Sequence, residues 1–231
     1  AFELTEDNNV STAAEAMNVP LSLALGLGSN VIPENAGATA TMATVRRNGD
    51  LSDALLVNLA SSGDDEATVP SSATIPAGQS TVTFPVAAVS DALADGNQPV
   101  TITASAAGHT PATAHLTVTD VDTPQLTLST DQASIQEGAA NPAATAILTR
   151  NASLDSPLVV IVSSENSARI QVPQTVTIPA GEGSVTFGLD AFDNAFVDGT
   201  QQVRILATAD GFHSASVRVQ LEDNDIPVLS L

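Results

Sequence analysis

Apolar and polar residues alternate along much of this chain, so that every second position is apolar within many short segments. Residues 82–86 read Val-Thr-Phe-Pro-Val, and residues 100–104 read Val-Thr-Ile-Thr-Ala. Because successive side chains of a β-strand point to opposite faces, this pattern predicts strands that bury one face and expose threonine and serine on the other. A helical period is nearly absent, so we expect an all-β protein.

The whole pattern is present twice. The segment Ile-Pro-Ala-Gly at residues 75–78 returns at 178–181, and the segment Asp-x-Asp-x-Pro at 120–124 returns at 223–227. Both pairs are separated by 103 residues. Self-similarity at a fixed spacing indicates a tandem array of one structural unit.

Turn signals separate the predicted strands, such as Asn48-Gly49, which suits a tight hairpin, and Pro76-Ala77-Gly78. About seven short strands per hundred residues, joined by such turns, are typical of a two-sheet sandwich. The chain has no tryptophan and no cysteine, so it lacks the hallmarks of a true immunoglobulin domain. We therefore predict tandem immunoglobulin-like antiparallel β-sandwiches.

The repeats divide the chain into four expected segments. Residues 21–124 form the first repeat and residues 125–227 the second. Residues 1–20 resemble the last strand of a preceding repeat followed by a connector, in which one capped helical turn is possible by sequence. Residues 228–231 resemble the first strand of a following repeat. These ends predict that the chain is one part of a longer array.

Composition narrows the possible partners and cofactors. The 231 residues carry a formal net charge of -20, and the six basic residues are all arginine. Such a charge repels nucleic acid and anionic lipid, and no apolar run reaches the roughly 18 residues that span a bilayer. We expect neither nucleic-acid binding nor membrane insertion. Because cysteine is absent, any metal would be held by oxygen atoms.

Catalytic chemistry is not indicated by the sequence. The three histidines, His109, His115 and His213, do not occupy corresponding positions in the two repeats. None lies beside a serine or cysteine in a nucleophile motif. We therefore expect that the chain is not an enzyme.

A set of charged positions links the repeats to a known family. Glu34 lies near the first predicted strand, Arg47 ends the second, and Asp95 lies in an acidic bend before the sixth. Residues 118–122 then close the repeat as Val-Thr-Asp-x-Asp. This pattern resembles the Calx-beta domain over nearly the full length of both repeats. The Ile-Pro-Ala-Gly segment is most similar to the tandem arrays of large bacterial surface proteins.

The resemblance implies a β-sandwich with calcium held by carboxylates at one end of each domain. In the first repeat the implied metal ligands are Glu34, Asp64 or Asp65, Asp91, Asp95, Asp120 and Asp122. In the second repeat they are Glu137, Asp193, Asp198, Asp223 and Asp225.

The second repeat departs from this pattern. Ser167 and Ala168 stand where the first repeat has Asp64 and Asp65, and fewer carboxylates imply weaker calcium binding. We therefore expect the first repeat to bind calcium more strongly than the second. Alternatively, these acids begin turns and end strands in an acidic protein and bind no metal.

The function expected is that of a structural or adhesive segment in a large secreted or cell-surface repeat protein, either a stalk or an extracellular fibre. Calcium would stiffen domain ends and junctions. The partners would be neighbouring repeats or copies of the chain, joined head to tail by strand addition, and a surface or protein ligand. Two alternatives are a calcium-binding regulatory or ligand-binding module, and an accessory domain of an exported enzyme.

Overall fold

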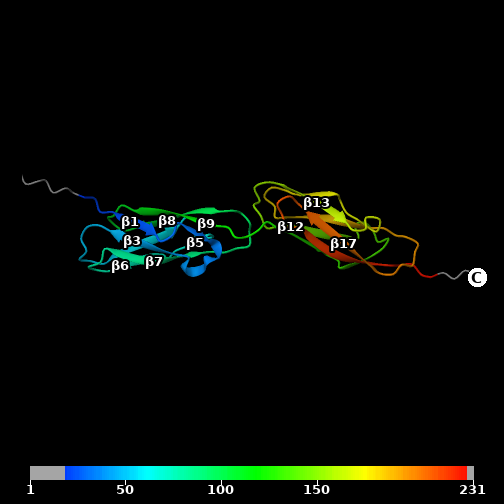
Figure 1. The fold of residues 1–231 in the computed structure, drawn as a ribbon, viewed down its shortest axis with the longest axis horizontal. Coiled ribbons are helices and arrows are strands. Elements are labelled where there is room, and N and C mark those ends of the chain that lie inside the picture. Colours follow the sequence, from blue (N-terminus) through cyan, green and yellow to red (C-terminus); the bar gives the residue numbers. More distant parts are fainter. Residues whose placement is uncertain (1–18, 228–231) are drawn as a thin grey trace, which may run out of the picture. The chain divides into compact units, whose positions relative to one another are not determined.

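The computed structural model describes residues 19–227 (Figure 1). The strand expected near the start of the chain and most of its connector lie outside the described residues, as does the strand expected at 228–231. Within the described range the protein is all-β, with eighteen strands and one short 3-10 helix. The strands form four sheets, two in each of two sandwiches, and this confirms the predicted fold class.

The first sandwich is drawn from blue to green in Figure 1 and contains nine strands. They are β1 (Leu23–Leu27), β2 (Val31–Pro33), β3 (Thr41–Arg47), β4 (Leu55–Ser61), β5 (Ala67–Thr68), β6 (Ser72–Ile75), β7 (Thr81–Ala88), β8 (Gln98–Ser105) and β9 (Ala112–Thr119), with the 3-10 helix η1 (Glu34–Thr39) after β2. One sheet has the strand order β1-β3-β7-β5 and the other has the order β2-β9-β8-β4-β6.

The second sandwich repeats this topology strand for strand. Its strands are β10 (Leu126–Thr130), β11 (Ser134–Gln136), β12 (Ala144–Arg150), β13 (Leu158–Ser164), β14 (Ile170–Gln171), β15 (Thr175–Ile178), β16 (Ser184–Ala191), β17 (Gln201–Thr208) and β18 (Ala215–Glu222). The sheet orders are β10-β12-β16-β14 and β11-β18-β17-β13-β15. The shortest strands, such as β5 and β14, bring the count above the seven or so that the sequence predicted.

Each sandwich has its own hydrophobic core, built as the alternating pattern predicts. On β7, Phe84, Val86 and Ala88 are buried, whereas the residues between them are partly exposed. The corresponding strand β16 buries Phe187 and Leu189 in the same way. The inward faces of the two sheets thus supply the core of each unit.

One arginine in each repeat stabilises the loop that follows the second long strand. Arg47 is 5% exposed and donates from Nη2 to the carbonyl oxygen of Asp53 at 2.7 Å. Arg150 is 9% exposed and donates from Nη1 to the carbonyl oxygen of Ser156 at 2.8 Å. Both therefore bind backbone oxygens and have a structural role. Across residues 19–227, no helix has the length and apolar character needed to cross a membrane.

Candidate functional site

Three carboxylates come together at one end of the first sandwich. Glu34 follows β2 directly, and Asp120 follows β9 directly, while Asp122 lies two residues further. Because β2 and β9 are neighbours in one sheet, their ends bring these side chains together. One carboxylate oxygen of each lies within 4.8 Å of those of the other two. Glu34 is only 4% exposed, so this group of acids reaches into the protein.

Backbone hydrogen bonds hold Asp120 in this position. Its Oδ2 accepts from the backbone N of Gly96 at 2.7 Å, and its Oδ1 accepts from the backbone N of Asp122 at 2.7 Å. The first bond ties the acidic bend at Asp95 and Gly96 to the closing segment of the repeat. The bend therefore lies beside Asp120, and the Asp95 residue itself is exposed and is not one of the three converging acids.

The structure does not add the other predicted acids to this group. Asp64 and Asp65 are exposed in the turn that precedes β5, and neither belongs to the set of converging carboxylates. Asp91 is also exposed, and its Oδ1 accepts from the backbone N of Leu93 at 2.7 Å. That bond is the turn-forming role that aspartate often takes in loops.

The same three positions converge in the second sandwich. Carboxylate oxygens of Glu137, Asp223 and Asp225 also lie within 4.8 Å of one another, and Glu137 is 1% exposed. Asp223 accepts from the backbone N of Gly199 at 2.6 Å and from the backbone N of Asp225 at 2.8 Å. The backbone frame of the two acidic ends is therefore the same.

An arginine that the sequence analysis did not single out lies within the second group. Arg169 is 8% exposed, and its Nη2 lies 2.5 Å from Oε2 of Glu137 and 3.5 Å from Oδ1 of Asp198. Arg169 directly follows Ser167 and Ala168, the two residues already known to differ from the first repeat. The signal that could have found it is its alignment with Glu66, which lies 103 residues earlier.

The electrostatic setting differs between neighbouring acids of the second group. Hydrogen bonds from the backbone of Gly199 and then Asp225 hold the pKa of Asp223 below its usual value. Desolvation, followed by repulsion from Asp223, Asp193 and Asp198, raises the pKa of Asp225. Asp193 and Asp198, which the sequence also suggested as ligands, are not among the three converging acids. Oδ2 of Asp225 is buried and has no hydrogen-bond partner.

A glycine allows Asp193 to approach the backbone of the loop that follows β11. Gly138 has a φ of +69°, and a Cβ at this position would lie 3.1 Å from Cβ of Asp193. A larger residue would therefore need both a left-handed backbone and a displaced Asp193.

Both clusters are compatible with a calcium site. Calcium binds six to eight oxygens, from carboxylates, backbone carbonyls and water, on loops such as these. The clusters consist of Glu and Asp alone and contain no cysteine or histidine, the residues that bind zinc most often. Carboxylate oxygens alone favour a hard cation such as calcium.

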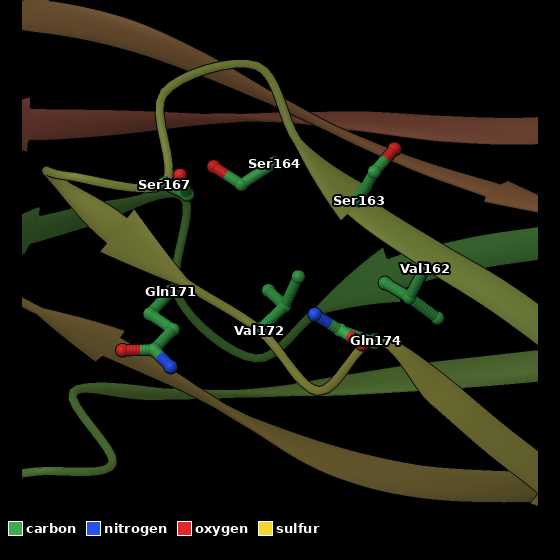
Figure 2. A pocket seen from close by; sticks show the side chains of 7 residues that line it. All are labelled: Val162, Ser163, Ser164, Ser167, Gln171, Val172 and Gln174. Atoms are coloured by element: carbon green, nitrogen blue, oxygen red, sulfur yellow. The ribbon is translucent and has the colours of Figure 1, made fainter.

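A surface pocket elsewhere on the second sandwich has different chemistry. Its walls come from β13, β14 and the loops beside them (Figure 2). The lining residues are Val162, Ser163, Ser164, Ser167, Gln171, Val172 and Gln174. None of these side chains is ionisable near neutral pH, so the acidic ends are the better candidates for a cation site.

No protein-family model matches this sequence, and no curated protein matches it either. The chain is similar to the crystal structure of CBD12 from CALX1.2, with 13% identity, a TM-score of 0.35 and coverage of 80% of both chains. It is also similar to extracellular cadherin domains 1–5 of protocadherin gamma B2, with 17% identity and a TM-score of 0.37, over 90% of this chain and 41% of that chain. A glycosyl hydrolase family 2 member from Bacteroides cellulosilyticus matches with 13% identity and a TM-score of 0.34, over 79% of this chain and 23% of that chain.

Proposed function

We propose that this chain is a structural segment of a larger secreted or cell-surface repeat protein, and that calcium bound at the acidic end of the first sandwich stiffens it. The observation that carries the proposal is the convergence of Glu34, Asp120 and Asp122 within 4.8 Å. Two carboxylates about 4 Å apart repel each other by roughly 1 to 4 kcal/mol, depending on how well water screens them. A divalent cation between them attracts both carboxylates, and this attraction outweighs their mutual repulsion.

The expected affinity fits an extracellular role. Calcium sites of extracellular modules have dissociation constants of about 0.1 to 1 mM. A ligand present at one hundred times its dissociation constant stabilises the folded state by about 2.7 kcal/mol. Because Asp120 also binds the backbone of Gly96, a cation here would tie together the closing segment, the acidic bend and the start of η1.

Calcium titration of a matched pair of variants tests this proposal. We expect the 231-residue chain to bind calcium in isothermal titration calorimetry and to unfold at a higher temperature with calcium than with chelator. Asp122→Asn should weaken binding about tenfold or more, because a charged ligand is lost. Asp64→Asn removes an exposed acid outside the cluster and should leave the affinity unchanged. Absence of both heat and thermal shift in the unmodified chain would refute the calcium role.

Association between copies is the second part of the proposal. The strands expected near both ends of the chain could complete neighbouring repeats by strand addition, which produces head-to-tail polymers. Sedimentation velocity over a range of concentrations is the appropriate measurement. A species distribution that shifts to higher mass with concentration supports strand addition, and a single monomer throughout contradicts it.

A further inference from the structure

The two acidic ends share one backbone arrangement but differ in the charge of a single residue. The backbone carbonyl of Glu66 accepts from the backbone N of Val89 at 2.8 Å in the first sandwich. The carbonyl of Arg169 accepts from the backbone N of Phe192 at 2.9 Å in the second. The two residues therefore hold the same place in the fold, in the turn before β5 and before β14 respectively. One is an acid and the other is a cation.

The Arg169 side chain is enclosed among the acids. It is 8% exposed and contacts Glu137 and Asp198 through Nη2. Its other two nitrogens, Nε and Nη1, are buried without a hydrogen-bond partner, as is Oδ2 of Asp225. The attraction of Arg169 also acts on the Asp225 carboxylate. A cation that is part of the chain thus lies among the carboxylates that a metal would need.

We infer that Arg169 serves as the built-in cation of the second sandwich, so that this end is ordered without calcium while the first end requires it. The inference rests on the proposed calcium role of the first sandwich. A calcium ion entering the second cluster would have to displace the guanidinium from Glu137, which is 1% exposed, or sit beside it against a like charge. The guanidinium of Arg169 stays protonated throughout the physiological pH range, so its positive charge remains among these acids at every such pH.

The consequence is a division of roles between two copies of one fold. The first sandwich would change its rigidity with calcium, and the second would keep the same rigidity at all calcium concentrations. A chain built of such units would respond to calcium at some of its domain ends only.

Charge-reversal variants of the full 231-residue chain test the inference. Arg169→Glu installs the residue type of the first repeat, and Glu66→Arg makes the reverse change. Arg204→Glu is the matched control, because it makes the same charge change at an exposed position on β17. Arg169→Gln removes the charge with a smaller perturbation and serves if Arg169→Glu does not fold.

Backbone amides that donate hydrogen bonds to Asp120 or Asp223 give separate NMR signals for the acidic ends of the first and second sandwiches. Gly96 and Asp122 donate to Asp120, and Gly199 and Asp225 donate to Asp223. In the unmodified chain, calcium should shift the first pair of signals and leave the second pair unchanged. In Arg169→Glu or Arg169→Gln, the second pair should shift too, with calcium affinity at that end raised about tenfold or more. Glu66→Arg should abolish the response of the first pair, and Arg204→Glu should behave as the unmodified chain.

Several outcomes would overturn the inference. One is a calcium response of Gly199 and Asp225 in the unmodified chain at the concentration that shifts Gly96. Another is a folded Arg169→Glu and a folded Arg169→Gln that both show no response at Gly199. If Gly96 and Asp122 do not respond in the unmodified chain, the proposed calcium function fails. The role of Arg169 is then still tested by its variants: a calcium-dependent shift of Gly199 and Asp225 supports that role, and no shift contradicts it.

Discussion

Glu137 is the most buried acid among the described residues of the second sandwich, and its carboxylate is held by protein groups in place of water. Glu137 is 1% exposed, and its carboxylate contacts the guanidinium of Arg169, the side-chain amide of Asn194 at 3.4 Å and the backbone N of Asn224 at 3.3 Å. A buried charge is tolerated only when it is paired and hydrogen-bonded in this way. The partners of Glu137 come from three separate loops, so one side chain joins the loops at this end.

Removal of Arg169 should therefore destabilise the second sandwich strongly. We expect Arg169→Ala to lower the free energy of unfolding of the second sandwich by about 3 to 5 kcal/mol in the presence of chelator, because the buried Glu137 carboxylate would lose its charged partner. Arg204→Ala, at an exposed site, should change it by less than about 0.5 kcal/mol. Urea unfolding followed by circular dichroism is suitable, since the chain has no Trp or Tyr. Equal effects of the two variants would show that the buried pair contributes little.

The pKa shifts of two neighbouring aspartates predict opposite responses to pH. The pKa of Asp225 is raised, so its charged form is disfavoured in the folded state. Asp225→Asn should therefore increase stability at pH values above the raised pKa, without calcium, and the gain should vanish as pH falls below the ordinary value near 3.8. The pKa of Asp223 is lowered, so its contribution is present above 3.8 and is lost as pH falls through the lower folded value.

NMR titration of the side-chain carboxyl carbons measures both values directly. Asp225 should titrate at higher pH than Asp223 in calcium-free buffer. The reverse order would mean that the hydrogen bonds from Gly199 and Asp225 do not hold the Asp223 carboxylate in solution.

At the scale of elements, alternation along a strand decides which substitutions matter. On β13, Val160 is fully buried between the sheets, whereas its neighbours Val159 and Ile161 are 58% and 60% exposed. All three are β-branched apolar residues, so composition alone does not separate them. The strand register separates them, because Val160 lies opposite Val176 on β15 and both side chains are on the core side.

Truncation of adjacent residues on β13 tests this register. Val160→Ala should destabilise the second sandwich by about 2 kcal/mol, through lost burial and a small cavity. Ile161→Ala removes more atoms but from an exposed position, and should cost less than about 1 kcal/mol. A larger effect of Ile161→Ala would mean that the outer face of β13 is covered by a partner in solution.

The long strands were predictable from sequence because a period of two is a local property of the chain. Residues 82–86 and 100–104 fall within β7 and β8, as expected. The short strands β5 and β14 have only two residues each, too few for alternation to identify them. Their position depends on pairing with β7 and β16, which is a contact distant in sequence.

The acidic site was only partly predictable for the same reason. The Calx-beta resemblance implied Glu34, Asp120 and Asp122 as metal ligands, and the structure brings their carboxylates together. The same resemblance implied Asp64 or Asp65, from the loop before β5, but neither belongs to the converging group. Arg169 was missed because a search for metal ligands selects oxygen donors and passes over a cation.

For the whole molecule, the dominant property is a net charge of -20 on 231 residues. Such an excess of one sign destabilises a compact state by self-repulsion, and dissolved salt screens that repulsion over about 10 Å at 0.1 M ionic strength. Calcium and general screening should therefore both stabilise the protein, but by different routes and at different concentrations.

Thermal unfolding in different salts separates the two routes. Raising sodium chloride from about 10 mM to 500 mM should raise the unfolding temperature gradually, since the repulsion is spread over the surface. Under the proposed function, calcium should act at millimolar concentration, where it adds little ionic strength, by binding the converging carboxylates of the first sandwich. Magnesium is the control, because it dehydrates reluctantly and prefers a small octahedral site. An identical shift with millimolar magnesium and calcium would assign the effect to charge screening and remove the case for a built calcium site.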